Sequence, residues 1–175
     1  MVKKLVLVLG GARSGKSRFA QQMASEAAEK VLFVATAEAL DKEMRARIVE
    51  HRKNRPGHWR TLETTSSLGQ KLKTEIGDAR VVIIDCLTLL ISNIIGSSDK
   101  DSEKRVLTEI EELIAVTGQI EASFIIVSNE VGLGLVPDNP LGRNFRDLAG
   151  KAHQLIAGAA SEVYFMVAGL PLKLK

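Results

Sequence analysis

A glycine-rich segment near the start of the chain constrains the fold more than any other feature. Residues 10–17 read Gly-Gly-Ala-Arg-Ser-Gly-Lys-Ser, which satisfies the phosphate-loop pattern G-x-x-x-x-G-K-[ST] in full. The apolar run Val2–Leu9 precedes it, and Ser17–Lys30 follows with apolar residues at helical spacing. The glycines let backbone N–H groups turn toward phosphate oxygens, and the opening helix adds the positive end of its dipole. The segment therefore predicts a nucleoside triphosphate site in which Lys16 reaches the β- and γ-phosphates and Ser17 ligates Mg²⁺.

The rest of the chain alternates between apolar runs and helical stretches. The runs are continuous rather than alternating, which is typical of parallel strands buried on both faces. We therefore expect an α/β, P-loop NTPase-like (RecA-like) fold with a mostly parallel sheet flanked by helices. The further strands are predicted at Val31–Ala35, Val81–Ile84, Phe124–Val127 and Val163–Val167, with a short one ending near Glu63, and the helices at Ser17–Lys30, Leu40–Arg55, Leu68–Ile76, Glu103–Thr117 and Leu141–Ala160.

Composition excludes several classes of protein. With 175 residues, 45% of them hydrophobic and 26% charged, the chain is too apolar for a disordered protein and suits one domain over residues 1–175. Its single cysteine, Cys86, excludes a disulfide scaffold and fits a reducing compartment. No apolar run approaches the roughly 18 residues of a membrane span. We expect a cytoplasmic protein without a membrane span.

A carboxylate follows the predicted strand Val81–Ile84 directly. Asp85 there matches the Walker B arrangement, in which an acid at the carboxyl edge of the sheet meets the metal ion. Together with the phosphate loop, it predicts that Asp85 and Ser17 hold Mg²⁺. Cys86, the next residue, is expected to act as a small buried hydrophobe.

Basic residues are concentrated between positions 41 and 60. This stretch holds seven basic and three acidic residues, a net charge of +4 in a chain of net charge +3, and indicates an anionic ligand. His51 lies there near an apolar stripe that we expect to face the sheet, with Arg47 and Arg55 four residues to either side. Neighbouring cations favour a neutral imidazole, which near phosphates is a nucleophile. Spacing alone favours the alternative, a helix histidine with local hydrogen bonds. His58 and His153 have no comparable setting.

Motifs beyond the phosphate loop extend along nearly the whole chain. The full set is Gly10–Arg18, Ala35-Thr36-Ala37, Asp41-x-Glu43-Met44, Arg47-Ile48-x-x-His51-Arg52, Arg55-Pro56, His58-Trp59-Arg60-Thr61-x-Glu63, Asp85-Cys86-Leu87-Thr88, Ser128-Asn129-Glu130-Val131-Gly132-x-Gly134-x-Val136-Pro137 and Phe145–Gly150. On these residues the sequence resembles, almost from end to end, the bifunctional adenosylcobinamide kinase/adenosylcobinamide-phosphate guanylyltransferase family of cobalamin biosynthesis. The most specific of the motifs are the histidine helix and the loop at 128–137.

The resemblance implies two reactions. A nucleoside triphosphate, ATP or GTP, phosphorylates adenosylcobinamide; His51 then takes GMP from GTP and passes it to adenosylcobinamide phosphate, giving adenosylcobinamide-GDP. It implies Lys16 and His51 as catalytic residues, Mg²⁺ as cofactor, and a homo-oligomer, suggested to be a trimer. It also implies that the nucleotide contacts are Gly10, Gly11, Ala12, Arg13, Ser14, Gly15, Lys16, Ser17, Ala35, Thr36, Ala37, Arg52, Lys53, Asn54, Arg55, Glu63 and Asp85.

Three other functions explain the sequence less well. A P-loop small-molecule or nucleotide kinase without a covalent step would leave the basic histidine helix unexplained. A GTP-binding switch usually reads guanine with Asn-Lys-x-Asp, whereas the chain has Asn129-Glu130-Val131-Gly132. A nucleic-acid binder is disfavoured because basic and aromatic residues do not interleave.

The loop Asn129–Pro137 follows a predicted strand, where α/β proteins bind ligands, so it is expected to contact corrinoid or nucleotide.

Overall fold

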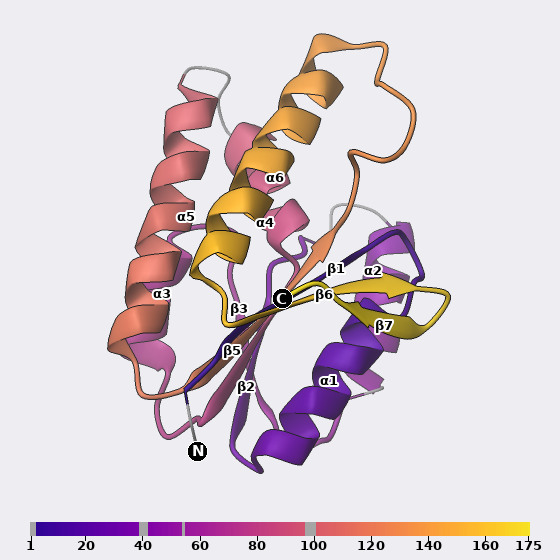
Figure 1. The fold of residues 1–175 in the computed structure, drawn as a ribbon. Helices are drawn as coiled ribbons and strands as arrows, with labels where there is room; N and C mark the ends of the chain where they lie inside the picture. Colours follow the sequence, from indigo (N-terminus) through magenta and orange to yellow (C-terminus); the bar gives the residue numbers. More distant parts are fainter. Residues whose placement is uncertain (1–2, 39–41, 54, 97–100) are drawn as a thin grey trace.

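The chain folds around a twisted sheet that runs through its centre. A computed structural model describes residues 3–38, 42–53, 55–96 and 101–175, without the side chains of residues 43, 44, 47 and 51. Within these residues the sheet has seven strands in the order β3-β2-β4-β5-β1-β6-β7, all parallel except β7, which pairs antiparallel with β6 (Figure 1). The strands are β1 (Leu5–Gly10), β2 (Val31–Ala35), β3 (Arg60–Glu63), β4 (Val81–Asp85), β5 (Ser123–Asn129), β6 (Glu162–Val167) and β7 (Leu170–Lys173).

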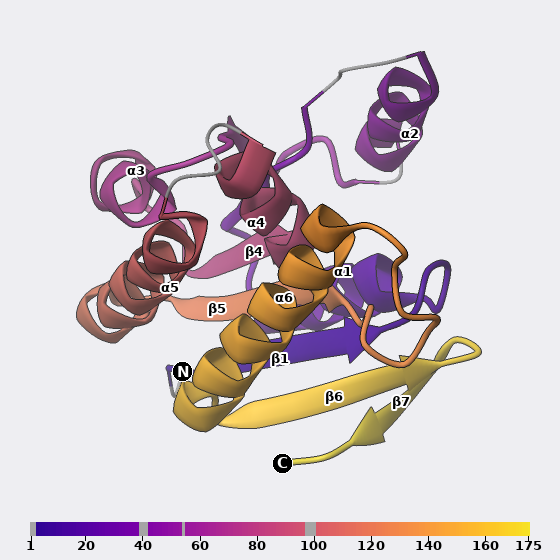
Figure 2. The ribbon, with the colours of Figure 1, turned by 90° about the horizontal axis from the view of Figure 1, so that it is seen from above.

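Helices cover the two faces of the sheet unequally. Alternate strand residues, such as Leu7 and Leu9 against Val6 and Val8, point into two separate apolar cores. One core is closed by several helices, and the other by the helix Lys16–Ala27 together with Trp59. Figures 1 and 2 show helices on both faces of the sheet. The continuous apolar runs of the sequence are thus buried on both faces, as predicted. The helices are α1 (Lys16–Ala27), α2 (Lys42–Lys53), α3 (Leu68–Glu75), α4 (Leu87–Gly96), α5 (Ser102–Gln119) and α6 (Pro140–Ala159).

The predicted helix 40–55 is present as α2, and Figure 2 shows it set apart from the sheet. None of its described side chains is buried. Of the predicted apolar stripe, Ile48 is half-buried, and the side chains of Met44 and His51 lie outside those described, so the facing of the stripe stays a prediction. The apolar stripe of α2 is narrow, and a helix this polar buries too little surface to pack on a sheet by itself.

Two elements were not predicted. Helix α4 was missed although Leu87, Leu90, Ile91, Ile94 and Ile95 recur at helical spacing; these residues are buried, while Ser92 and Gly96 are exposed. Strand β7 is short, exposed along its length and contains Pro171, which is tolerated because β7 is an edge strand.

The turn between β6 and β7 contacts the phosphate loop. The backbone N–H of Gly169 donates a hydrogen bond to the carbonyl oxygen of Ser14 at 3.0 Å. A Cβ on Gly15 would lie 3.2 Å from the Cα of Gly169, so the two backbones are closely packed. The last hairpin of the sheet therefore supports the loop that follows its first strand.

Candidate active site

Strand register brings the predicted site residues to one edge of the sheet. Ala35 at the end of β2 pairs with Asp85 of β4 on one side and Glu63 of β3 on the other. Gly10, at the end of β1, pairs with Asn129 of β5. Because these strands are parallel, their carboxyl ends form one continuous rim, where α/β proteins bind ligands.

The phosphate loop has the backbone geometry that its sequence predicts. Gly10 and Gly15 adopt φ values of 151° and 96°, which residues with a Cβ atom rarely adopt. Gly15 is the N-cap of α1, so no side chain caps the helix, and the first turn of the helix contains no acidic residue. The N-terminal N–H groups and the positive end of the helix dipole are thus oriented toward an anion.

Lys16 is directed into this loop. Its side chain is only 7% exposed, and Nζ donates a hydrogen bond to the carbonyl oxygen of Gly11 at 2.5 Å. Burial lowers the pKa of Lys16, while Cys86 and Asp85 act in the opposite direction. Ser14 is also buried, Gly11 and Ser17 are half-buried, and Ala12 and Arg13 are exposed. The loop thus holds a cationic group beside its backbone donors.

Asp85 carries the least satisfied polar atom of the site. Its Oδ2 is buried and has no hydrogen-bond partner among the described residues. A carboxylate oxygen in that position is costly unless a cation or donor meets it. Among the described residues no group of three or more His, Cys, Asp or Glu side chains could hold a metal ion. The unpartnered carboxylate oxygen itself fits a cation that is held through one or two side chains and phosphate oxygens, as Mg²⁺ is in nucleotide enzymes.

Thr36 fixes the chain around Asp85. Its fully buried hydroxyl donates to the carbonyl oxygen of Cys86 at 2.7 Å and accepts from the Cys86 N–H at 2.8 Å. Its own N–H donates to the Asp85 carbonyl oxygen, and its carbonyl accepts from the Asn93 side chain at 2.9 Å. The polar groups of Thr36 are thus engaged within the protein, and they tie the ends of β2 and β4 together. Ala35 and Ala37 on either side are half-buried.

Cys86 behaves as the sequence predicted. It is buried, and burial raises the pKa of its thiol to about 11. Its Sγ lies 3.2 Å from the Thr88 hydroxyl.

The basic segment meets the rim at two points. Arg52 of α2 forms an ion pair with Glu63 at the end of β3. Arg55 lies over the ring of Phe33, 3.7 Å from its centre; burial lowers its pKa, and Asp85 opposes that shift. Lys53 is exposed, Asn54 lies outside the described residues, and the side chain of His51 is not among those described. The helix that carries His51 is therefore attached to the rim, while the imidazole itself is not located.

A hydrogen-bonded cluster beside the rim was missed from the sequence. Ser128 and His153 are both buried, and the Ser128 hydroxyl lies 2.7 Å from His153 Nε2. His153 Nδ1 lies 3.7 Å from a carboxylate oxygen of Glu130. Burial lowers the pKa of His153, and Glu130 opposes that shift. Ser128 and His153 are 25 residues apart in sequence. The one sequence signal for the cluster is that His153 lies at helical spacing from apolar residues of the predicted helix.

Fold and site together define a P-loop nucleotide-binding enzyme. A family model described as "Cobinamide kinase / cobinamide phosphate guanyltransferase" matches residues 6–174. The chain belongs to this family.

Its relatives match over nearly their full length. It is 41% identical to the bifunctional adenosylcobalamin biosynthesis protein CobU of Escherichia coli K12, across 98% of this chain and 99% of the relative. It is 47% identical to the bifunctional adenosylcobalamin biosynthesis protein CobP of Pseudomonas aeruginosa, across 97% and 96% of the two chains. The resemblance seen in the sequence is thereby confirmed. No helix in the described part of the chain is long and apolar enough to span a membrane.

Proposed function

We propose that this chain phosphorylates the hydroxyl of adenosylcobinamide with a nucleoside triphosphate, and then transfers GMP from GTP to the phosphate through a covalent adduct on His51. Membership of a cobinamide kinase and cobinamide phosphate guanyltransferase family supports both activities. Within the molecule, the proposal rests on one observation: a buried lysine, Lys16, and a buried carboxylate oxygen without a partner, Asp85 Oδ2, both lie at a complete phosphate loop.

The kinase half follows from positioning and charge. The phosphate loop binds the β- and γ-phosphates through its N–H groups, and Lys16 neutralises charge on the oxygens as the acceptor oxygen bonds to the γ-phosphorus. The β–γ P–O bond breaks, and the nucleoside diphosphate leaves with the electron pair. ATP or GTP would serve equally in these contacts, because the loop reads phosphates rather than the base.

Asp85 and Ser17 are the residues that would hold Mg²⁺. The buried and unpartnered Oδ2 of Asp85 fits a cation ligand, and Ser17 lies one residue inside α1, next to Lys16. An ion held by these residues would offset the negative charge of the phosphates. Thr36 contributes by holding the Asp85–Cys86 backbone in place.

The guanylyl half assigns the nucleophile to His51. The unprotonated nitrogen of a neutral imidazole attacks the α-phosphorus of GTP, the α–β P–O bond breaks, and pyrophosphate leaves with the electron pair. A phosphate oxygen of adenosylcobinamide phosphate then bonds to the same phosphorus, the P–N bond breaks, and the histidine is released. The basic residues of α2 and the motif around Arg47 support this assignment.

The remaining nucleotide contacts are proposed along the rim. Ala35 and Ala37 would contribute backbone contacts, with Thr36 between them held by its bonds within the protein, and Arg52, Lys53, Asn54 and Arg55 would meet the triphosphate. Glu63 suits guanine, whose N1–H and amino group can donate to a carboxylate. Because Glu63 forms an ion pair with Arg52, nucleotide binding at Glu63 would also affect the end of α2.

The active form is proposed to be a homo-oligomer, a trimer. A helix whose described side chains remain unburied is suited to a neighbouring subunit, and α2 is such a helix. Light scattering of the purified protein measures the mass, and a monomer at working concentration would refute this part of the proposal.

Labelling with GTP tests the covalent step. Incubation with α-labelled GTP and Mg²⁺ should leave acid-labile, alkali-stable label on the protein, whereas γ-labelled GTP should leave none on His51. His51→Ala should lose this label and guanylyl transfer but retain kinase activity, because γ-transfer needs no covalent histidine. The exposed His58 supplies the matched control, and His58→Ala should label normally. Normal labelling of His51→Ala would refute the covalent mechanism and leave a simple P-loop kinase.

A further inference from the structure

An exposed apolar loop leaves the rim beside the phosphate loop. Residues 131–137, here called the leucine loop, connect β5 to the turn before α6. Leu133 and Leu135 are 81% and 96% exposed, and Val136 is also exposed. Single exposed leucines are ordinary on protein surfaces, but three large aliphatic side chains within four residues form a patch of the kind that marks a binding surface.

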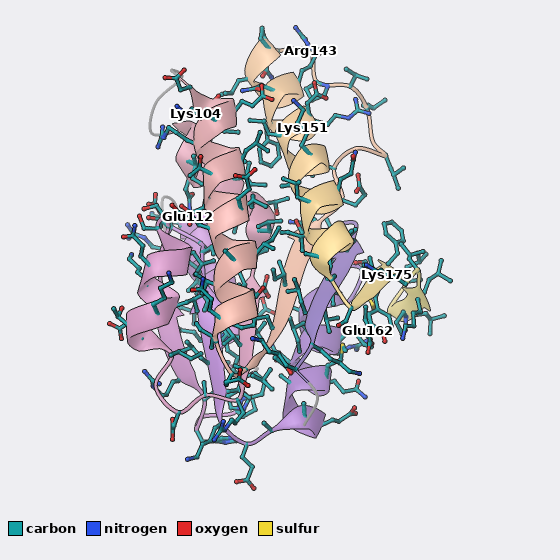
Figure 3. The ribbon with its side chains drawn as sticks, turned by 60° about the vertical axis from the view of Figure 1, so that its left-hand side comes forward. Lys104, Glu112, Arg143, Lys151, Glu162 and Lys175 are labelled. Carbon is teal, nitrogen blue, oxygen red and sulfur yellow. The ribbon has the colours of Figure 1, made fainter. Side chains whose placement is uncertain are left out.

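Hydrogen bonds hold the backbone of the leucine loop at both ends. At its start, Gly132 N–H donates to the Glu130 carboxylate and Gly132 O accepts from the Arg146 guanidinium at 2.6 Å. At its end, Arg143 donates to the carbonyl oxygens of Pro137 and Asp138 at 3.0 and 2.8 Å. Figure 3 shows Arg143 at the start of α6, beside this loop. The aliphatic side chains therefore project from a fixed backbone, which lowers the entropy lost when a ligand binds.

The loop starts at the nucleotide site. Asn129 pairs with Gly10 in the sheet, and the next residue, Glu130, donates its backbone N–H to the Gly10 carbonyl oxygen at 2.9 Å. Figures 1 and 2 both show the loop rising from the edge of the sheet where β1 ends. The base of the leucine loop is thus attached to the phosphate loop, and Leu133 and Leu135 follow Glu130 by three and five residues.

We propose that the leucine loop receives the corrin ring of the acceptor. This inference rests on the proposed function, since it takes cobinamide as the substrate. The reacting hydroxyl is carried on a short side chain of a large macrocycle, and it must meet the γ-phosphate at the phosphate loop. The ring must therefore bind no farther from that loop than the side chain can extend. A corrin face is broad and rich in methyl and methylene groups, which suits aliphatic side chains on a fixed backbone.

The test compares acceptors with and without the ring. Leu133→Ser and Leu135→Ser should each raise the KM for adenosylcobinamide by about tenfold, because a buried leucine contributes roughly one such factor to affinity. The KM for the nucleoside triphosphate and GMP labelling from α-labelled GTP should stay unchanged. Phosphorylation of N-acetyl-1-amino-2-propanol, which carries the arm without the ring, should also stay unchanged. Leu174→Ser is the matched control. Leu174 is also exposed, by 59%, but its backbone N–H donates a hydrogen bond to Val163, near the amino end of β6 and thus away from the rim.

The outcomes separate this inference from the proposed function. A parent protein that phosphorylates neither acceptor refutes the proposed function. An active parent whose two leucine variants keep the parental KM for adenosylcobinamide refutes the ring site alone. Light scattering of each variant completes the test. A rise in KM that accompanies a changed oligomeric mass would also overturn the ring site, because the loop would then be a contact between copies of the chain.

Discussion

Replacing Gly10 with alanine should destabilise the protein before any nucleotide is involved. A Cβ at position 10 would lie 2.6 Å from the carbonyl oxygen of Met166 and 2.7 Å from the Ser14 hydroxyl oxygen. The first of these atoms belongs to the backbone of the neighbouring strand β6 and cannot move away cheaply. Overpacking of this kind costs about 1–3 kcal/mol. Holding alanine at a φ of 151° costs about 1–3 kcal/mol more.

These terms together give a loss of about 2–6 kcal/mol in the free energy of unfolding. For a domain of this size, about 1 kcal/mol corresponds to a shift of roughly 2–4 °C in Tm, so Tm should fall by about 4–24 °C. The assay is thermal unfolding followed by circular dichroism without nucleotide, with urea unfolding to measure the free energy.

The neighbouring glycine supplies the control. A Cβ on Gly11 would meet nothing within 4 Å, and its φ lies outside the left-handed range. Gly11→Ala should therefore leave Tm unchanged or raise it slightly, because alanine restricts the unfolded chain. If Gly10→Ala melts with the parent, or Gly11→Ala melts as early as Gly10→Ala, the steric reasoning is wrong.

Three further predictions concern the site and its surroundings. Lys16→Ala should lower the rate of phosphoryl transfer by about 10²–10³, as loss of one electrostatic stabiliser does; near-normal turnover would show that the phosphate loop is not the kinase site. Asp85→Asn should raise the Mg²⁺ concentration needed for half-maximal activity, and an unchanged metal titration would leave Asp85 a structural role only. Burial lowers the pKa of His153, so folding stability should be full above the unfolded-state value of about 6.5 and fall as the pH drops below it. His153→Gln should lose less stability than the parent between pH 7.5 and 5.5, measured by urea unfolding, and equal losses would contradict the sign worked out here.

The sheet and the phosphate loop were predictable because their signals are local. Continuous apolar runs mark buried strands, and the eight residues 10–17 fix a loop by their own backbone requirements. Asp85 was found for the same reason, since an acid directly after such a run must lie at the carboxyl edge.

What sequence reasoning missed depends on contacts between distant segments. The link from Ser128 to His153 exists only because β5 and α6 pack together. Thr36 was predicted as a nucleotide contact, and nothing nearby in sequence signals that its hydroxyl holds Cys86, 50 residues away. The position of α2, set apart from the sheet, could not be predicted because helical spacing reports which residues share a face, but not whether another element covers it.

The position of β1 has a consequence for synthesis of the protein. This first strand lies between β5 and β6, which come from the last third of the chain, and the Gly169 N–H bonds to its phosphate loop. A nascent chain therefore exposes both edges of β1, a run of valine and leucine, until nearly all of its residues have left the ribosome. Nucleotide affinity should arise late and abruptly during translation, and the growing chain should depend on chaperones more than a fold assembled from adjacent hairpins.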